Sequence, residues 1–276
     1  MRKIVSIIGL LITAFALQAQ DEPSDDFKIG AVSFGVGGFM PGKYVANYYS
    51  GSNANINKIL YIFENKYRYN EVKQELGGYD FNRWTTPEKM RYKLATAISF
   101  RASLNTSAHT SFFIHVNKLN LVATDIFTID LDMPIGLQLD YKQHKIWGKE
   151  SRTMLDVGFQ QLSEMNAQHV SWFYELAFNL TNTKVLENSI EIGKLTYSIL
   201  NGEQNFLTPG DPFQAWEPEI ATGVGISASL GWRYAPLPQA SIDFGVTGYM
   251  QDINLEGYKK FHPSFNLFMR VNLLMF

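Results

Sequence analysis

The stretch Glu219–Tyr234 alternates residue by residue between two kinds of side chain over its whole length. The even-numbered positions from Ile220 to Tyr234 are apolar or threonine, and the positions between them are small or charged. Successive side chains of a β-strand point to opposite faces, so this alternation predicts a strand. Strands of globular proteins usually have about 3–10 residues. A longer strand with an apolar band and an aromatic rim is typical of a transmembrane β-barrel.

The same alternation predicts seven more strands, and the connections between them are of two kinds. Antiparallel strands with long links at one end and tight turns at the other are the arrangement of outer-membrane barrels. We therefore predict an all-β, antiparallel transmembrane barrel of eight strands, or ten if Ile190–Leu200 forms a further hairpin. The predicted strands are 27–39, 90–104, 109–131, 151–162, 169–181, 219–234, 239–251 and 264–276, with long insertions near 40–89, 132–150, 182–218 and 252–263.

Two stretches depart from simple alternation. In the third strand the apolar phase shifts after Val116, which predicts a β-bulge near Asn117–Lys118. In the first long insertion, apolar residues recur at helical spacing and predict a short helix over about Asn55–Leu76. We interpret this helix either as a docking element at the surface or as a helix that packs on the barrel mouth.

The N-terminus has the pattern of an export signal. Arg2 and Lys3 precede an apolar stretch, Ile4–Phe15, which is too short to span a bilayer. We expect residues 1–19 to be a signal peptide, 20–26 a periplasmic tail and 27–276 the barrel. Charged residues are 18% of the chain and aromatic residues 14%, which favours an apolar exterior. The net charge of −2 gives no reason to expect nucleic acid, and without cysteine there is neither a disulfide nor a lipidated cysteine.

The export signal, the alternating strands, the rhythm of the connections and the terminal Phe276 together resemble small bacterial outer-membrane barrels of the eight-stranded OmpA/OmpX type. The insertions are much longer than those of the smallest members. The resemblance implies a location in the outer membrane of a Gram-negative bacterium, with lipid and lipopolysaccharide around the barrel. It also implies that the barrel-assembly machinery recognises Phe276, and that other envelope proteins are candidate partners.

Six charged side chains are expected inside the barrel when the alternation is projected inward. An eight-stranded barrel is narrow and filled by side chains, and a lone buried charge is costly, so opposite charges there should pair. We interpret them as a network that plugs the lumen; the alternative is a polar path for small solutes. The six residues are Arg101, Asp156, Glu175, Arg233, Asp243 and Arg270.

Catalysis has little support in the sequence. The histidines form no HExxH motif or paired helical ligands, so we predict no metal and no cofactor. Two short runs, His109–Ser111 and His262–Ser264, leave open a lipid-modifying hydrolase as an alternative, and His262 is otherwise expected at the rim. We expect a protein that is not an enzyme.

The first long insertion is rich in aromatic residues. Exposed aromatic side chains favour binding sites, although these could instead pack together as a lid. We therefore predict a non-catalytic barrel that anchors surface loops for partner binding or as a subunit of an envelope complex. The candidate partner-binding residues are Tyr44, Tyr48, Tyr49, Phe63, Tyr67 and Trp84, and the candidate interface girdle is Trp172, Trp232 and Tyr234.

Overall fold

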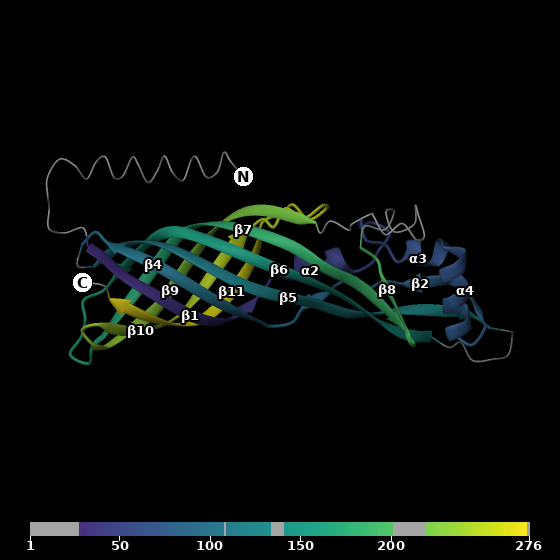
Figure 1. Cartoon of the computed structure of the whole chain (residues 1–276), viewed down its shortest axis with the longest axis horizontal. Coiled ribbons are helices and arrows are strands. Elements are labelled where there is room, and N and C mark those ends of the chain that lie inside the picture. The colour runs from purple at the N-terminus through teal and green to yellow at the C-terminus, as the bar shows by residue number, and fades with distance from the viewer. Residues whose placement is uncertain (1–27, 108, 134–140, 201–218, 275–276) are drawn as a thin grey trace, which may run out of the picture.

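A computed structural model describes residues 28–107, 109–133, 141–200 and 219–274. The expected signal peptide (1–19), the N-terminal tail (20–26), the terminal Phe276 and much of the predicted insertion near 182–218 lie outside these residues. The described chain forms an elongated molecule, with a barrel at one end and a smaller group of helices and strands at the other (Figure 1).

Eight antiparallel strands form a closed barrel, in which β1 pairs with β11 and β5 pairs with β6 to complete the wall. This confirms the predicted eight-stranded class. The alternative of ten is wrong, because the Ile190–Leu200 stretch supplies the end of β7 and a short strand, β8 (Leu195–Ser198), which pairs with β7 beyond the barrel wall. The barrel strands are β1 (Lys28–Met40), β4 (Ala95–Asn105), β5 (Thr110–Asp132), β6 (Tyr141–Leu162), β7 (Val170–Ile192), β9 (Ile220–Leu237), β10 (Ala240–Gln251) and β11 (His262–Leu274).

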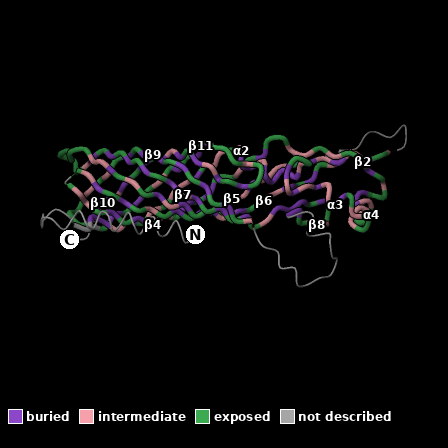
Figure 2. The backbone as a smooth tube through the Cα atoms, turned by 90° about the horizontal axis from the view of Figure 1, so that it is seen from above, coloured by how far each residue is buried: buried purple, intermediate pink, exposed green. Residues whose placement is uncertain are grey.

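The barrel is apolar on its outside and polar on its inside. In β9 the side chain of Ile226 is 63% exposed, whereas the neighbouring Ser227 is buried. In β11 the odd-numbered apolar residues from Phe265 to Leu273 point outward in the same way, and Figure 2 shows this alternation of buried and exposed positions along the barrel strands. A soluble sheet would bury its apolar face, so this arrangement suits an environment of lipid.

In β5 the two faces of the strand exchange character halfway along. Ile114 and Val116 are exposed on the outside, but the next apolar side chains, Leu119 and Leu121, are buried on the inside. The pairing of β5 with β6 runs without a register shift from Thr110 to Asp130, so the predicted bulge is wrong. The apolar phase shifts because the surroundings change: above the apolar belt the outside of the strand is mostly polar, with Ile126 exposed among polar residues, while its inside faces a hydrophobic core.

The upper parts of β5, β6 and β7 continue past the barrel into a folded unit that we call the cap. In the cap, β2 (Asp80–Thr85) and β3 (Arg91–Tyr92) pair with β5, and β8 pairs with β7, so the sheet has the order β2-β5-β6-β7-β8. The helices are α2 (Lys43–Ala46), the 3₁₀ helix η1 (Asn47–Tyr49), α3 (Leu60–Glu64) and α4 (Lys66–Glu75). Figure 1 shows β2, β8, α3 and α4 at the far end of the molecule from the barrel, with α2 nearer the barrel.

Three predicted boundaries in the cap need correction. The helix expected over Asn55–Leu76 is two helices, because Asn65 is extended (φ −77°, ψ 112°) and its side chain accepts hydrogen bonds from the backbone of Tyr67 and Arg68 to cap α4. The insertion expected near 132–150 is largely strand, since β6 begins at Tyr141. The strand expected over 90–104 is divided into β3 and β4. Within the described ranges no helix is both long and apolar enough to cross a membrane.

Candidate functional site

Five of the six predicted lumen charges meet in one buried network. Arg101 and Arg270 both donate to the carboxylate of Glu175, the latter over 2.8 Å. Arg270 also donates to the Oδ2 atom of Asp243 over 2.7 Å, and Arg233 donates to the Oδ1 atom of the same carboxylate over 2.7 Å. Since these side chains are almost wholly buried, apart from Arg233, each charge depends on its neighbours for stabilisation.

The sixth charge, Asp156, lies in a neighbouring polar group. Its carboxylate accepts hydrogen bonds from Asn179 (2.7 Å) and Asn117 (3.2 Å), and the Nδ1 atom of His115 lies 3.5 Å away. The Nε2 atom of His115 is buried and makes no hydrogen bond to the described residues. Asp156 is therefore stabilised mainly by neutral amide donors.

An apolar layer crosses the lumen above these polar groups. Its buried members come from β1, β4, β5, β6 and β10, so they reach the interior from both sides of the wall. Beside them, buried polar side chains of β7, β10 and β11 are joined by hydrogen bonds from Thr181 to Gln251 and from Gln251 to Ser264, so apolar and polar side chains together fill this level of the lumen. The layer consists of Phe39, Ala95, Ala97, Leu119, Leu121, Met154 and Tyr249.

A second buried ion pair closes the barrel at the cap. Glu150 and Arg152 are two residues apart on the inward face of β6, with 2.5 Å between carboxylate and guanidinium. The hydroxyl groups of Tyr49 (2.5 Å) and Tyr92 (3.0 Å) donate to the same Glu150 carboxylate. Gly148 makes room for this arrangement, because a Cβ atom there would lie 2.0 Å from the ring of Tyr49. The lumen is thus closed at its upper end by side chains from both barrel and cap.

The Glu150–Arg152 pair lies outside the six charges expected from the sequence. Both residues share the inward parity of Asp156 on β6, so continuing the alternation of that strand toward its start would have found them. Assigning 132–150 to a loop hid Glu150, whereas Arg152 lies within the predicted strand 151–162 and was left out of the six charges.

The cap has its own hydrophobic core, which contains most of the aromatic residues predicted to bind a partner. Tyr48 and Tyr49 are fully buried with their rings 5.0 Å apart, and Phe63 packs against Phe81 at 4.9 Å. Tyr44 and Trp84 are half-buried against the same core. These side chains pack together, as the alternative interpretation expected, because their large ring areas are removed from water. Tyr67 differs from them, with a side chain that is 82% exposed.

Polar contacts tie this core to the barrel strands. The hydroxyl of Tyr48 donates to Glu219, which directly precedes β9, and burial together with that carboxylate holds the pKa of Tyr48 well above its ordinary value. The hydroxyl of Tyr258, in the β10–β11 connection, donates to Asn55 over 2.7 Å. The cap is therefore held by contacts from several connections of the barrel.

The histidine and serine residues considered for catalysis do not form a nucleophile and base pair in the described structure. His262 begins β11 at the cap-side end of the barrel, where its side chain is buried, and its Nδ1 lies 3.1 Å from the carbonyl of Lys260. Ser264 accepts a hydrogen bond from Gln251 at 3.1 Å. His109 is exposed, while Ser111 is buried on the inward face of β5. No group of three or more potential metal-ligating side chains occurs in the part of the chain that the structure describes.

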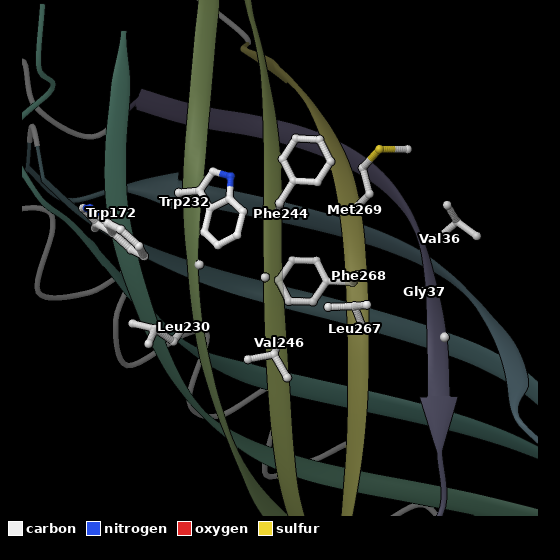
Figure 3. A pocket seen from close by; sticks show the side chains of 13 residues that line it. Val36, Gly37, Trp172, Leu230, Trp232, Phe244, Val246, Leu267, Phe268 and Met269 are labelled. Carbon is white, nitrogen blue, oxygen red and sulfur yellow. The ribbon is translucent and has the colours of Figure 1, made fainter. Parts of the chain in front are cut away.

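A shallow apolar groove of about 550 Å³ lies on the outer wall, across β7, β9, β10, β11 and β1. Figure 3 shows the side chains around it, among which Trp172 and Trp232 lie on neighbouring strands with ring centroids 5.7 Å apart. Both indoles are exposed and close to the tight turns, as is Tyr234. This position, at the end of the apolar belt, is where aromatic girdles of membrane barrels occur.

The closed wall, the apolar exterior and the side-chain-filled interior define the class: this is an all-β, antiparallel barrel of eight strands. No protein-family model matches the chain, and no curated protein matches it in sequence.

Three solved structures are similar in fold. Neisserial surface protein A (NspA) has a TM-score of 0.41 and 8% identity over 91% of this chain and 100% of that one. Ail, the attachment invasion locus protein of Yersinia pestis, in complex with the heparin analogue sucrose octasulfate, has a TM-score of 0.38 and 10% identity over 90% of this chain and 100% of that one. OprG from Pseudomonas aeruginosa has a TM-score of 0.36 and 10% identity over 90% of this chain and 95% of that one. Each similarity concerns the fold alone.

Proposed function

We propose that this chain is a non-catalytic, non-conducting barrel of the bacterial outer membrane, which holds the cap at the cell surface to contact another envelope protein or a larger complex. One observation carries the proposal. The strands β5, β6 and β7 pass without interruption from the apolar belt into the cap, and their buried face is polar in the barrel but apolar in the cap. Strands of this kind suit a lipid environment at the barrel end and an aqueous environment at the cap end.

The filled lumen argues against the alternative of a solute channel. In the lower network three arginines share two carboxylates through direct contacts, and a third carboxylate, Asp156, lies in the neighbouring polar group. Above them lie an apolar layer and then the Glu150–Arg152 pair, so an ion would have to displace packed side chains at three levels. Moving an ion through hydrocarbon is costly without a polar partner.

Recording currents across planar bilayers that contain the purified full chain tests the closed lumen. We expect no stable single-channel openings. Reproducible openings with wild-type protein, but not with detergent or a heat-unfolded sample, would overturn the proposal and favour the channel.

Cross-linking in living cells tests the surface role of the cap. A photoreactive amino acid placed at the exposed Tyr67 of α4 should give a discrete cross-link to an envelope protein. The same amino acid at the lipid-facing Leu104 of β4 is the matched control and should not give that product. If Tyr67 and further exposed cap positions such as Asn70 and Asn82 all gave no specific product, the cap would have no protein partner and the proposal would be wrong.

A further inference from the structure

Exposed basic side chains are distributed unevenly along the barrel axis. The three turns at the end opposite the cap, residues 105–110, 162–170 and 234–240, contain neither lysine nor arginine. Every lysine or arginine with a side chain that is exposed in the described structure lies instead toward the cap, while Lys28 begins β1 at the other end, opposite Asn105. The two ends of the apolar belt therefore meet differently charged surroundings.

Five of these side chains gather on one side of the molecule, where the belt meets the cap. Arg91 pairs with Thr124 of β5, and the backbone of Lys93 donates to Val122 on the same strand over 2.9 Å. The helix α2 lies against β3. Lys118 stands lower on the same outward face of β5, opposite Ile98 of β4. We call this group the basic patch, and it comprises Lys43, Lys89, Arg91, Lys93 and Lys118.

The five basic side chains of the patch outnumber the one exposed acidic residue next to them in the chain, Glu88. All five side chains are exposed, and none forms an ion pair with any residue in the described ranges. By contrast, Lys149 of the neighbouring strand β6 is neutralised by Glu187 at 2.7 Å, and Lys73 of α4 by Asp80 at 2.7 Å. Five like charges on one surface repel one another unless an anion lies between them.

Large apolar side chains lie directly below the patch. Leu94, which lies between β3 and β4, is 70% exposed, and Ile98 of β4 is 68% exposed. Met40 at the upper end of β1 is exposed in the same belt. A ligand that binds both surfaces must place anionic groups on the basic patch and hydrocarbon on the apolar side chains, and an anionic lipid has both parts. A soluble polyanion would bind only the basic patch.

We propose that the basic patch binds the phosphate groups of anionic lipids in the leaflet around the cap end of the barrel, with the acyl chains against Leu94, Ile98 and Met40. The inference rests on the proposed membrane location. A lysine or arginine near an anionic membrane surface contributes about fivefold in affinity, so several together would select such a lipid from a mixed bilayer.

The test uses the full barrel in mixed micelles or nanodiscs, with diphosphorylated lipid A as probe and phosphatidylethanolamine as neutral reference. Native mass spectrometry counts the retained lipids. We expect the wild-type protein to retain lipid A selectively, and the Lys43→Gln/Arg91→Gln/Lys93→Gln variant to lose at least about tenfold in selectivity. The matched control, Lys66→Gln/Arg83→Gln/Lys194→Gln, removes three exposed charges from the cap away from the belt and should retain the preference.

The outcomes separate this inference from the proposed function. If all three proteins insert and fold, as judged by circular dichroism and electrophoretic mobility before and after heating, but retain lipid A equally, the basic patch is not a lipid site while the membrane barrel stands. Equal loss in the control variant would also overturn it. If the patch variant loses only binding of a soluble sulfated oligosaccharide, the ligand is a polyanion and not a lipid. Failure of the wild type to insert would overturn both proposals.

Discussion

Glu175 shows how single residues stabilise the barrel interior, because two arginines depend on this one buried carboxylate. Arg101 makes no other ion pair among the described residues, and its Nη2 atom already lacks a hydrogen-bond partner. Removing the charge of Glu175 would therefore leave a buried guanidinium without compensation.

We predict that Glu175→Gln lowers the free energy of unfolding in lipid by about 3–5 kcal/mol, as expected when one partner of a buried ion pair is lost. Urea titration of the reconstituted barrel, followed by tryptophan fluorescence, measures the change. Glu187→Gln is the control, since it breaks the partly exposed pair with Lys149 and should change stability little. Equal stability of Glu175→Gln and wild type would mean that the lumen network is dispensable.

His144 gives the cap a dependence on pH. It is buried beside Phe127, and burial, followed by the charge of Lys142, lowers the pKa of its imidazole below the ordinary value near 6.5. The unfolded chain then binds a proton more readily than the folded cap. The contribution of neutral His144 is thus fully present above about pH 6.5 and is lost as the pH falls below that value.

We predict that limited proteolysis of the cap accelerates between pH 7.5 and 5 in the wild type, and that His144→Gln reduces this acceleration. The cleavage rate of each protein at pH 7.5 serves as its own reference. This separates the effect of protonating His144 from any loss of packing that the substitution causes. An unchanged pH dependence in the variant would show that other groups control it.

At the scale of the element, much of the barrel could be predicted from the sequence. In β9 and β11 one face contacts the exterior along the whole strand, so period-2 alternation identifies the strand and its outward face, whereas the register between strands was not predicted. In β5 the same rule predicted a bulge, because hydrophobicity does not reveal whether the apolar side faces lipid or a protein core. The buried Tyr48 and Tyr49 were mistaken for candidate surface residues for a related reason: the sheet that covers them comes from strands far away in the chain.

The exchange of faces along β5 predicts opposite responses to one substitution. Val116→Arg puts a charge on the lipid-facing belt and should destabilise the barrel by about 2–4 kcal/mol. Ile126→Arg lies on the same outward parity of the strand, but above the belt, where a charge is solvated and should be tolerated. Folding yield into lipid vesicles distinguishes the two. Equal losses would mean that the belt extends along the whole of β5.

At the scale of the whole molecule, the barrel and the cap share their longest strands. Phe127, Ile146 and Ile190 of β5, β6 and β7 belong to the cap core, although the same strands form the barrel wall lower down. No loop or linker separates the two parts along these three strands within the described ranges. We therefore expect the cap to keep one orientation relative to the barrel.

Spin labels test this rigidity, and the absence of cysteine from the chain allows them to be placed singly. One label at the exposed Asn82 of β2 and another at Thr222 of β9 should give one narrow distance distribution by pulsed electron resonance. A pair within the barrel, at Thr96 and Thr222, sets the width expected for a rigid body. A clearly broader distribution for the first pair would show that the cap swings.

The uninterrupted strands have a mechanical consequence. The fourteen residues of β5 from Leu119 to Asp132 extend roughly 45 Å along the strand, at about 3.3 Å per residue. A force applied at the tip of such a stiff lever is delivered to its base, so anything that pulls on the far end of the cap also pulls on the ion pairs between the arginines and carboxylates below. Binding of a partner at the far end of the cap and the closure of the lumen by its ion pairs would then be mechanically linked.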